Sequence, residues 1–297
     1  MRILLTGKNG QVGYELERSL QGLGEIIALD RSQMDLANLD QVRDVIRAIK
    51  PDLIINPAAY TAVDKAESEP ELAMRINGEA PGVMAEEAKK LGAAMIHYST
   101  DYVFDGSKTT PYVETDPTCP INVYGTTKLA GEQAIQAAGI PHLILRTSWV
   151  YGMRGKNFLL TMLRLAQERD ELRIVADQHG APTWCRTIAD TTAHIVAQAQ
   201  GAHDAQQWWQ QRSGIYHLTA QGQTTWYGFT QAILENATIP KKPVLTPIAT
   251  RDYPLPAKRP GYSVMSCERL MATFCGLPDW ENALASCLQE IAIMDKA

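Results

Sequence analysis

A glycine-rich turn directly after the first apolar segment constrains this chain more than any other feature of its sequence. Residues 2–6 form a β-type run, and residues 7–13 then read G-K-N-G-Q-V-G at the start of a helical pattern. Glycines at this spacing allow a tight turn, close approach of the backbone to a pyrophosphate, and close packing of the helix on the strand. Free N–H groups at the helix N-terminus favour phosphate as well. The segment therefore predicts a dinucleotide-binding turn.

A carboxylate follows the second β-type run at the distance that this turn requires. Asp30 comes 20 residues after Gly10, where an acidic side chain binds the adenosine ribose hydroxyls. This position favours NADH, whereas the neighbouring Arg31 could meet the 2′-phosphate of NADPH, so both cofactors stay open. A turn or capping role for Asp30 is the alternative. Two residues before the next helix are expected to border the adenine, Asp35 and Leu36.

Strand and helix patterns alternate throughout the first half of the chain. Further apolar β-type runs lie at residues 52–56, 93–98 and 142–146, with helical patterns between them. This alternation predicts an α/β fold, a Rossmann-type doubly wound parallel sheet with right-handed crossovers. Ligands of such sheets bind at the carboxyl ends of the strands. The motifs converge there, because four residues each follow a strand end: Gly7, Asn56, Ser99 and Thr147.

The second half is less regular and predicts a smaller mixed α/β domain. We expect residues 1–150 to form an NAD(P)-binding domain, to which some later segments return, and residues 151–297 to be mainly substrate-binding. Residues 198–213 are rich in glutamine and predict a surface insertion, whose adjacent tryptophans pack onto their own domain. Residues 241–260 hold five prolines and several basic residues, which predict an ordered loop suited to a phosphate-bearing ligand.

Tyr124 and Lys128 lie four residues apart in a segment that predicts the start of a helix. On a helix, this spacing places both side chains on one face, one turn apart. A phenol has a pKa near 10, and a nearby ammonium group lowers that pKa by stabilising the phenolate. The pair therefore predicts a general acid, with an ordinary surface helix as the alternative.

Hydroxyl and carboxylate groups follow the strand at residues 93–98. The Thr100 hydroxyl could bond a substrate carbonyl, and the carboxylate of Asp101 could hold sugar hydroxyls or assist proton delivery. Serine and threonine at strand ends are also plain turn formers, so that alternative stays open. Asn77 falls within a helical pattern, where a structural role is our default expectation.

The composition disfavours several other classes of protein. A net charge of −5 disfavours generic nucleic-acid binding, and no apolar run approaches the roughly 20 residues that span a bilayer. Five cysteines without a C-x-x-C pair are read as reduced thiols of a cytoplasmic protein. The first residues do not form a signal peptide, and the histidines show no metal spacing. We therefore expect neither a nucleic-acid nor a membrane partner.

Together these motifs resemble the extended short-chain dehydrogenase/reductase superfamily, and within it the dTDP-4-dehydrorhamnose reductase family. The glycine turn at 7–13, the Ser99-Thr100 site and Tyr124-x-x-x-Lys128 occur in the order of the superfamily. Further segments are specific to the narrower family. They are N-P-A-A-Y-T-A-V-D-K-A-E at 56–67, S-T-D-Y-V-F-D-G at 99–106, N-V-Y-G-T-T-K-L-A-G-E at 122–132, R-T-S-W-V-Y-G at 146–152, D-Q-H-G-A-P-T at 177–183, and R-P-G-Y-S at 259–263.

The resemblance implies a role for each matched residue. Tyr124 would give a proton to the C4 ketone oxygen, Lys128 would lower its pKa and hold the nicotinamide ribose, and Thr100 would orient the carbonyl. The cofactor would contact Tyr124, Lys128 and the following residues: Gly7, Gly10, Gln11, Val12, Gly13, Asp30, Asp35, Leu36, Ala59, Tyr60, Thr61 and Tyr98. The substrate would contact Thr100, Asp101, Trp149 and Arg259.

The resemblance also implies a reaction and its partners. NADH or NADPH would reduce dTDP-4-dehydro-L-rhamnose to dTDP-L-rhamnose, a precursor of rhamnose-containing cell-surface polysaccharide. A homodimer is an expectation from the family alone. Some members are described as homodimers linked by Mg²⁺ through clustered glutamates, of which this chain has Glu15 but no full acidic set that we can identify. We therefore predict no metal site.

Two other functions are compatible with the same scaffold. A nucleotide-sugar epimerase or dehydratase would retain its NAD and return the hydride, although a dehydratase normally needs more carboxylates than Asp101. A non-catalytic regulatory subunit of a methionine adenosyltransferase shares the fold. Such a subunit would need none of Thr100, Tyr124 and Lys128, and all three are present.

Overall fold

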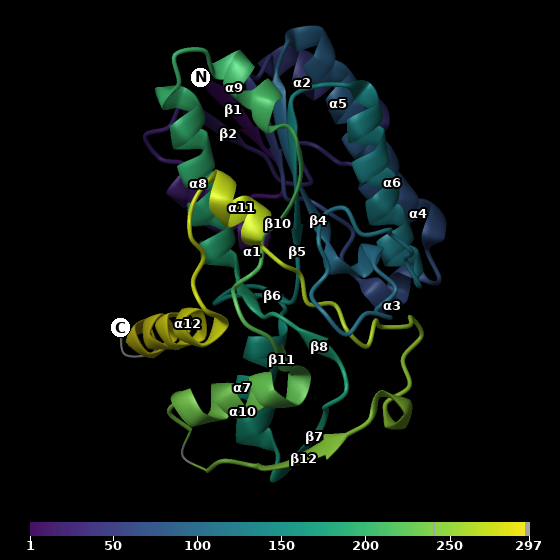
Figure 1. Ribbon diagram of the computed structural model, residues 1–297, viewed down its shortest axis with the longest axis vertical. Coiled ribbons are helices and arrows are strands. Elements are labelled where there is room, and N and C mark those ends of the chain that lie inside the picture. The colour runs from purple at the N-terminus through teal and green to yellow at the C-terminus, as the bar shows by residue number, and fades with distance from the viewer. Residues whose placement is uncertain (240, 295–297) are drawn as a thin grey trace.

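A six-stranded parallel sheet organises the upper part of the molecule in Figure 1, which shows a computed structural model that describes residues 1–239 and 241–294. Its strands run in the order β10-β5-β4-β3-β1-β2, and each neighbouring pair is parallel. They are β1 (Arg2–Leu5), β2 (Glu25–Ala28), β3 (Leu53–Asn56), β4 (Ala94–Thr100), β5 (His142–Thr147) and β10 (Gly214–His217). The strand order reverses at β1, so the predicted doubly wound sheet is confirmed.

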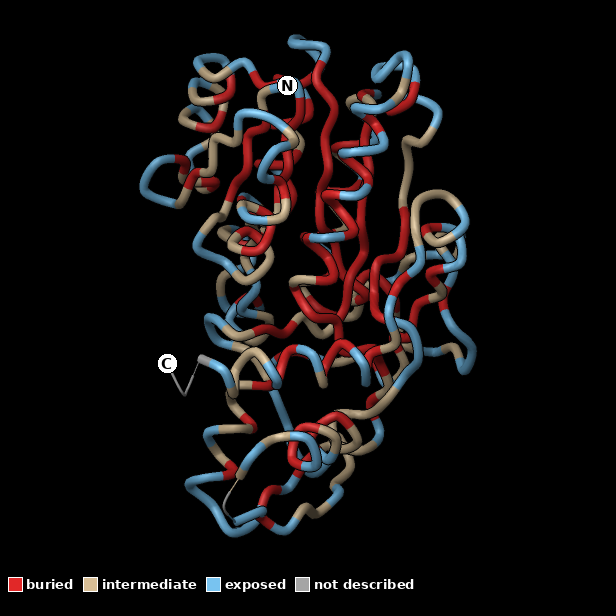
Figure 2. The backbone as a smooth tube through the Cα atoms, turned by 90° about the vertical axis from the view of Figure 1, so that its left-hand side faces the viewer, coloured by how far each residue is buried: buried red, intermediate tan, exposed pale blue. Residues whose placement is uncertain are grey.

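Helices cover both faces of this sheet and bury it (Figures 1 and 2). On one face lie α1 (Gln11–Ser19), α8 (Cys185–Gly201), α9 (Ala205–Arg212) and α11 (Glu268–Thr273). On the other lie α2 (Leu39–Ile49), α5 (Ala80–Leu91) and α6 (Val123–Ala138). Because both faces are covered, β3 and β4 are buried along their whole length, which explains their nearly continuous apolar sequences.

Several segments from beyond residue 150 return to the sheet. Strand β10 adds to its edge beside β5, and helices α8, α9 and α11 complete one of its faces. The division of the chain at residue 150 stays a prediction. Within the described ranges, no helix is long and apolar enough to cross a membrane.

A smaller α/β unit forms the lower part of Figure 1. Strands β7 (Glu171–Val175) and β12 (Val244–Ile248) pair in parallel. Helices α7 (Phe158–Glu168), α10 (Trp226–Asn236) and α12 (Trp280–Met294) share its apolar core. Two short strand pairs complete it, β6 (Val150–Tyr151) with β9 (Thr183–Trp184), and β8 (His179–Gly180) with β11 (Thr224–Thr225).

Two expectations about the second half differ from the structure. Residues 198–213 are not a surface insertion, because they form the end of α8 and then α9, whose Trp208 and Trp209 are 8% and 6% exposed. The two tryptophans pack into the core of the sheet, as expected, while Ala205 and the glutamines of α9 are exposed. Residues 241–260 are not loop throughout, because β12 pairs there with β7.

A buried ion pair ties α6 to β5. The guanidinium of Arg146 donates from Nε and Nη2 to the two carboxylate oxygens of Glu132, at 2.9 and 2.7 Å. Both side chains are almost fully buried, with exposures of 2% and 1%. Neither charge can be hydrated, so each depends on the other for its stability in the fold.

We predict that Arg146→Met lowers the free energy of unfolding by about 3–5 kcal/mol, because it leaves the Glu132 carboxylate buried without a partner. The control is Arg164→Met, which breaks the exposed Arg164–Glu168 pair on α7 and should cost less than about 1 kcal/mol. Urea denaturation of both variants measures the difference. Similar losses of unfolding free energy in the two variants would show that the buried Arg146–Glu132 pair is no more important for stability than the exposed pair.

Candidate active site

The glycine turn forms a close backbone cradle at the carboxyl end of β1. Gly7 has φ +60°, and a Cβ on Gly13 would come within 2.1 Å of the Gly7 carbonyl oxygen, so only glycine lets α1 approach this closely. Helix α1 begins after Gly10 without a side-chain cap, which leaves its first N–H groups available. Gln11 and Val12 occupy that first turn. These features fit the pyrophosphate of a dinucleotide.

Asp30 lies beside this cradle, as its spacing predicts. Its carboxylate accepts hydrogen bonds from the Ser32 N–H and hydroxyl at 2.9 and 2.6 Å, and from Asn9 of the cradle at 3.4 Å. The Ser32 hydrogen bond is the main reason that the pKa of Asp30 lies below its usual value. The side chain of Arg31 is 77% exposed and contacts Asp35 at 3.5 Å. Both an acceptor for ribose hydroxyls and a cation for a 2′-phosphate therefore follow β2.

The backbone after β3 is fixed by Asn77. Its side-chain amide accepts from the Tyr60 N–H at 2.8 Å and donates to the Tyr60 carbonyl at 3.0 Å. This buried asparagine has the structural role that we expected by default. It holds Ala59 and Thr61 on either side of the clamped residue. The Tyr60 hydroxyl donates to Glu69 at 2.7 Å, so its polar end is already engaged.

Helix α6 presents Tyr124 and Lys128 on one face at the carboxyl edge of the sheet. It begins at Asn122, whose side chain caps the N–H of Gly125 at 2.7 Å. A Cβ on Gly125 would lie 2.1 Å from the Tyr102 carbonyl oxygen, so this helix packs directly on the segment after β4. Tyr124 is half-buried, and its ring meets the Tyr102 ring edge-on at 5.8 Å. Lys128 is 2% exposed.

Thr100 and Asp101 complete this edge. The Thr100 hydroxyl donates to the Asp101 carboxylate at 2.9 Å and accepts from the Tyr102 N–H at 3.2 Å. Asp101 is only 2% exposed, and burial raises its pKa to about 6 although hydrogen bonds from Ser263 and Thr100 oppose the shift. The residues predicted to do chemistry therefore lie together.

The pKa of Tyr124 differs from the expectation that Lys128 lowers it. Burial raises the pKa of Tyr124 to about 12, the Thr100 hydroxyl offsets this in part, and Lys128 is not among the groups that shift it. The ammonium instead donates to the Tyr98 carbonyl at 2.6 Å and lies 3.2 Å from the His97 ring. Burial lowers the pKa of Lys128 to about 8. Spacing placed the lysine on the right face but could not show which oxygen it would bind.

Tyr98 contributes its backbone rather than its side chain. Its hydroxyl bonds the Thr192 hydroxyl of α8 at 2.7 Å, on the face of the sheet opposite α6. Successive side chains of a strand point to opposite faces, so His97 faces α6 while the Tyr98 ring faces α8. The expected contact of Tyr98 with the cofactor stays a prediction.

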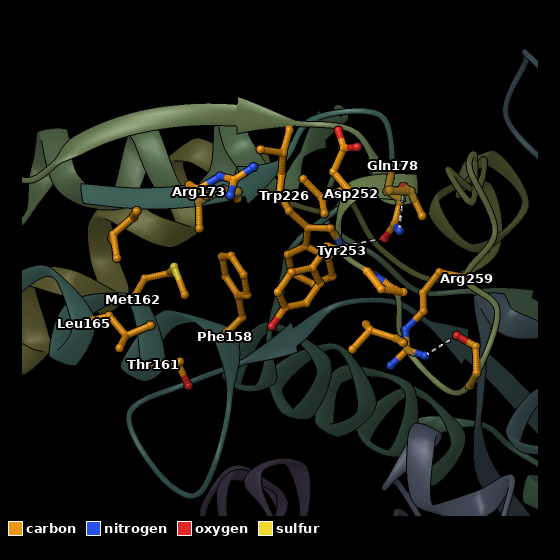
Figure 3. Close-up of a pocket in the computed structure, with 18 of the residues that line it drawn as sticks. Phe158, Thr161, Met162, Leu165, Arg173, Gln178, Trp226, Asp252, Tyr253 and Arg259 are labelled. Atoms are coloured by element: carbon orange, nitrogen blue, oxygen red, sulfur yellow. Dashed lines mark hydrogen bonds between the residues drawn. The ribbon is translucent and has the colours of Figure 1, made fainter. Parts of the chain in front are cut away.

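A pocket of about 980 Å³ adjoins the catalytic edge (Figure 3). It lies between α7, α10, the β7–β12 pair and the loop of residues 249–259. Tyr102 lines it and touches Tyr124, so the pocket and the catalytic residues are neighbours. Aromatic rings and cations stand around it: Phe158, Trp226, Tyr253, Arg169, Arg173, Lys258 and Arg259. This lining suits a flat base and an anionic group.

Arg259 and Trp149 reach the pocket in different ways. Arg259 lines it directly and binds both carboxylate oxygens of Asp64 at 2.7 Å, which fixes its guanidinium. Trp149 does not line it, but its ring stacks on that of Trp226 at 3.6 Å. Trp149 also has φ +46°, a strained backbone conformation for a tryptophan.

Sequence reasoning missed several residues around the site. Asp64 fixes Arg259, Tyr102 joins the pocket to the catalytic residues, and His97 connects Lys128 to Asn56, which the sequence placed only at a strand end. The signal for Asn56 and His97 was present in the sequence, because both are polar residues within apolar strands. The contact between Asp64 and Arg259 had no signal, because 195 residues separate them in the chain.

The residues present do not fit the magnesium ion that the family resemblance suggests. Glu15 is buried and bonds Arg186 at 3.1 Å, and the same guanidinium contacts Glu290. The Arg186 guanidinium therefore already supplies the positive charge beside the Glu15 carboxylate. In the part of the chain that the structure describes, no three His, Cys, Asp or Glu side chains are grouped as metal ligands.

Known proteins share both the sequence and the fold of this chain. The model of the family described as RmlD substrate binding domain matches residues 1–293. A dTDP-4-dehydrorhamnose reductase of Burkholderia thailandensis is 50% identical over 98% of this chain and 99% of its own. The reductase of the same name from Escherichia coli K12 is 47% identical over 98% of each. A crystal structure of dTDP-4-dehydrorhamnose reductase from Bacillus anthracis in complex with NADP matches with a TM-score of 0.89 and 35% identity, over 97% of this chain and 99% of that one.

We predict that Asp101→Asn stabilises the protein in a pH-dependent way. The folded pKa, about 6, exceeds the unfolded value of about 3.9, so the wild type loses stability as pH rises between them and its buried carboxyl ionises. The gain in free energy of unfolding should be small near pH 4, grow up to about pH 6 and then level off. Urea denaturation at a series of pH values measures it.

Asp105→Asn is the matched control with the opposite sign. Hydrogen bonds from Ser107 hold the pKa of Asp105 below its usual value, so this variant should lose stability at neutral pH, and the loss should shrink in acid. A pH-independent gain in Asp101→Asn would contradict the buried, raised-pKa carboxyl.

Proposed function

Because the chain belongs to the RmlD family of dTDP-4-dehydrorhamnose reductases, we propose that it reduces the C4 ketone of dTDP-4-dehydro-L-rhamnose with NAD(P)H and forms dTDP-L-rhamnose. The observation that carries this proposal is the meeting of Thr100, Tyr124 and Lys128 at one sheet edge, between the glycine cradle and the large pocket. The product would supply rhamnose-containing cell-surface polysaccharide.

The cofactor supplies the hydride that the ketone carbon receives. The cradle at Gly7, Gly10 and Gly13 holds the pyrophosphate at the N-terminus of α1, with Gln11 and Val12 in the first helical turn. Asp30 meets the adenosine ribose, and Asp35 and Leu36 border the adenine. Arg31 gives a 2′-phosphate a counter-charge, so the choice between NADH and NADPH needs measurement.

Tyr124 donates the proton that the ketone oxygen needs once hydride has reached carbon. Burial raises its pKa to about 12, so the hydroxyl is fully protonated at neutral pH but is a weaker acid than a free phenol. Thr100 turns its hydroxyl from the Asp101 carboxylate to the same oxygen and orients the carbonyl, while the freed Asp101 carboxylate holds a sugar hydroxyl. Lys128, whose ammonium bonds the Tyr98 carbonyl rather than the Tyr124 hydroxyl, binds the nicotinamide ribose.

The pocket binds the nucleotide part of the substrate. The rings of Phe158, Trp226 and Tyr253 gather in its centre in Figure 3, where a thymine could stack. Arg259 and Lys258 offer positive charge to the diphosphate, and Asp64 keeps Arg259 in a fixed orientation. Trp149 supports this wall by stacking on Trp226 and flanks the sugar.

Cofactor stoichiometry tests the proposal. The protein, NADH or NADPH, and dTDP-4-dehydro-L-rhamnose formed in situ are combined, and oxidation is followed by absorbance. One NAD(P)H consumed for each dTDP-L-rhamnose formed is the expected result. Turnover of the sugar nucleotide without net oxidation would instead identify an epimerase, and bound cofactor without any turnover would favour a regulatory subunit.

We predict that Tyr124→Phe abolishes turnover while cofactor binding survives, because only the proton-donating hydroxyl is removed. The expected loss in kcat is at least about 100-fold, the lower range for a positioned general acid. Tyr216→Phe is a matched control, since it deletes a hydroxyl on the outer strand β10 that donates to the Arg212 carbonyl of α9. Near-wild-type turnover in Tyr124→Phe would contradict the assignment of the proton donor.

A homodimer and a cytoplasmic location are kept as part of this proposal on the family resemblance. Light scattering of the purified protein would give the oligomeric state. We propose no role for Mg²⁺, because Arg186 already contacts both Glu15 and Glu290.

A further inference from the structure

A chain of buried polar side chains crosses the sheet behind Lys128. The Thr6 hydroxyl bonds the Asn56 amide at 2.6 Å, that amide lies 3.0 Å from Nδ1 of His97, and Nε2 of His97 lies 3.2 Å from the Lys128 ammonium. These residues are 0–2% exposed and come from the end of β1, from β3, from β4 and from α6. The proposed reaction so far gives no role to Asn56 or His97.

Hydrogen-bond chemistry restricts how this chain can be protonated. An ammonium has three N–H donors and no acceptor, so Lys128 can bond Nε2 of His97 only if that nitrogen carries no proton. Burial and the charge of Lys128 hold the pKa of His97 well below its usual value, so the ring is neutral and has one N–H. That N–H must then be on Nδ1, facing Asn56.

Asn56 can accept this N–H. Its Nδ2 faces Nδ1 of His97 and its Oδ1 faces the Thr6 hydroxyl in the structure. A half-turn of the amide exchanges the two atoms, presents Oδ1 to His97 and presents Nδ2 to the Thr6 oxygen, which can also accept. The neutral ring, the amide and the hydroxyl then each have a partner, as buried polar groups require.

We propose that His97, oriented by Asn56, is a positioning residue that holds the Lys128 ammonium for catalysis. The Tyr98 carbonyl takes one ammonium N–H and Nε2 of His97 takes a second, so these two bonds also fix the direction of the third. This role rests on the proposed function for its effect on turnover, although it also acts on cofactor binding.

The other charged and titratable groups near Lys128 do not replace His97. Glu132, one turn further along α6, favours the charged lysine, but both of its oxygens bond Arg146 of β5. Asp101 bonds Thr100 and acts on Tyr124. The Tyr98 hydroxyl points to α8. The neutral imidazole is thus the side chain that accepts from Lys128 within the described part of the chain.

His97→Leu tests this role, because it removes the acceptor and keeps an apolar side chain in the core. An ammonium that loses a hydrogen bond loses stability relative to the neutral amine, so the pKa of Lys128 falls. We expect kcat to fall about tenfold or more at neutral pH, the effect of one lost hydrogen bond to a charged group. The alkaline limb of the pH profile should move to lower pH by about one unit.

His97→Gln is the rescuing variant, since its amide oxygen can reach the place of Nε2 and accept from Lys128. We expect its pH profile to lie close to that of the wild type. His217→Leu is the control for loss of a buried neutral histidine, because that ring bonds the Ser266 carbonyl from β10. It should lower the melting temperature and leave the pH profile unchanged.

The dissociation constant of NADP should be measured over the same pH range by protein fluorescence, because this readout needs no turnover. As the pH rises, NADP binding should begin to weaken at a lower pH in His97→Leu than in the wild type. An inactive wild type would overturn the proposed function but leave this binding test intact. Wild-type kinetic and binding profiles in His97→Leu, or equal shifts in His97→Leu and His97→Gln, would overturn the role of His97.

Discussion

The hydrogen bond from the Lys128 ammonium to the Tyr98 carbonyl joins α6 to the end of β4, and the proposed site depends on this join. A buried ammonium is costly unless its donors are satisfied, so the bond fixes the depth at which α6 lies against the sheet. The close contact of Gly125 with the Tyr102 backbone fixes the same helix one turn earlier. Tyr124, the residue before Gly125, is held by these contacts beside Thr100.

The rest of the fold places the ligand-binding residues around this contact between α6 and β4. The parallel sheet brings the ends of β1, β3, β4 and β5 to one edge, so the glycine cradle and the proton donor share a crevice. The smaller unit closes the other side with the pocket that begins at Tyr102. Its loop is tied back to the first half by Arg259 on Asp64 and by Asn122 on the Lys258 carbonyl. Residues for cofactor, chemistry and nucleotide thus meet although they lie far apart in the chain.

The sequence could predict what local periodicity and spacing encode. The glycine turn, the alternation of strands with helices and the pairing of Tyr124 with Lys128 on one face all follow from short-range patterns. It could not predict partners chosen by tertiary packing. In the glutamine-rich segment, the packing of helix α9 was not predicted because Trp208 and Trp209 fill a space between α8 and α11. Strand β12 likewise depends on its pairing with β7. Lys128 likewise bonds a carbonyl on another element, so its effect on Tyr124 could not be read from the spacing.

The fate of the hydride is a direct test of ketone reduction at this site. NADPH or NADH with deuterium at the transferred position is incubated with dTDP-4-dehydro-L-rhamnose, and the product is analysed by mass spectrometry and proton NMR. We expect one deuterium atom per product molecule, located at C4 of the rhamnose, with an equal amount of oxidised cofactor. A sugar product without deuterium, or with deuterium at another carbon, would contradict a ketone reduction at this site.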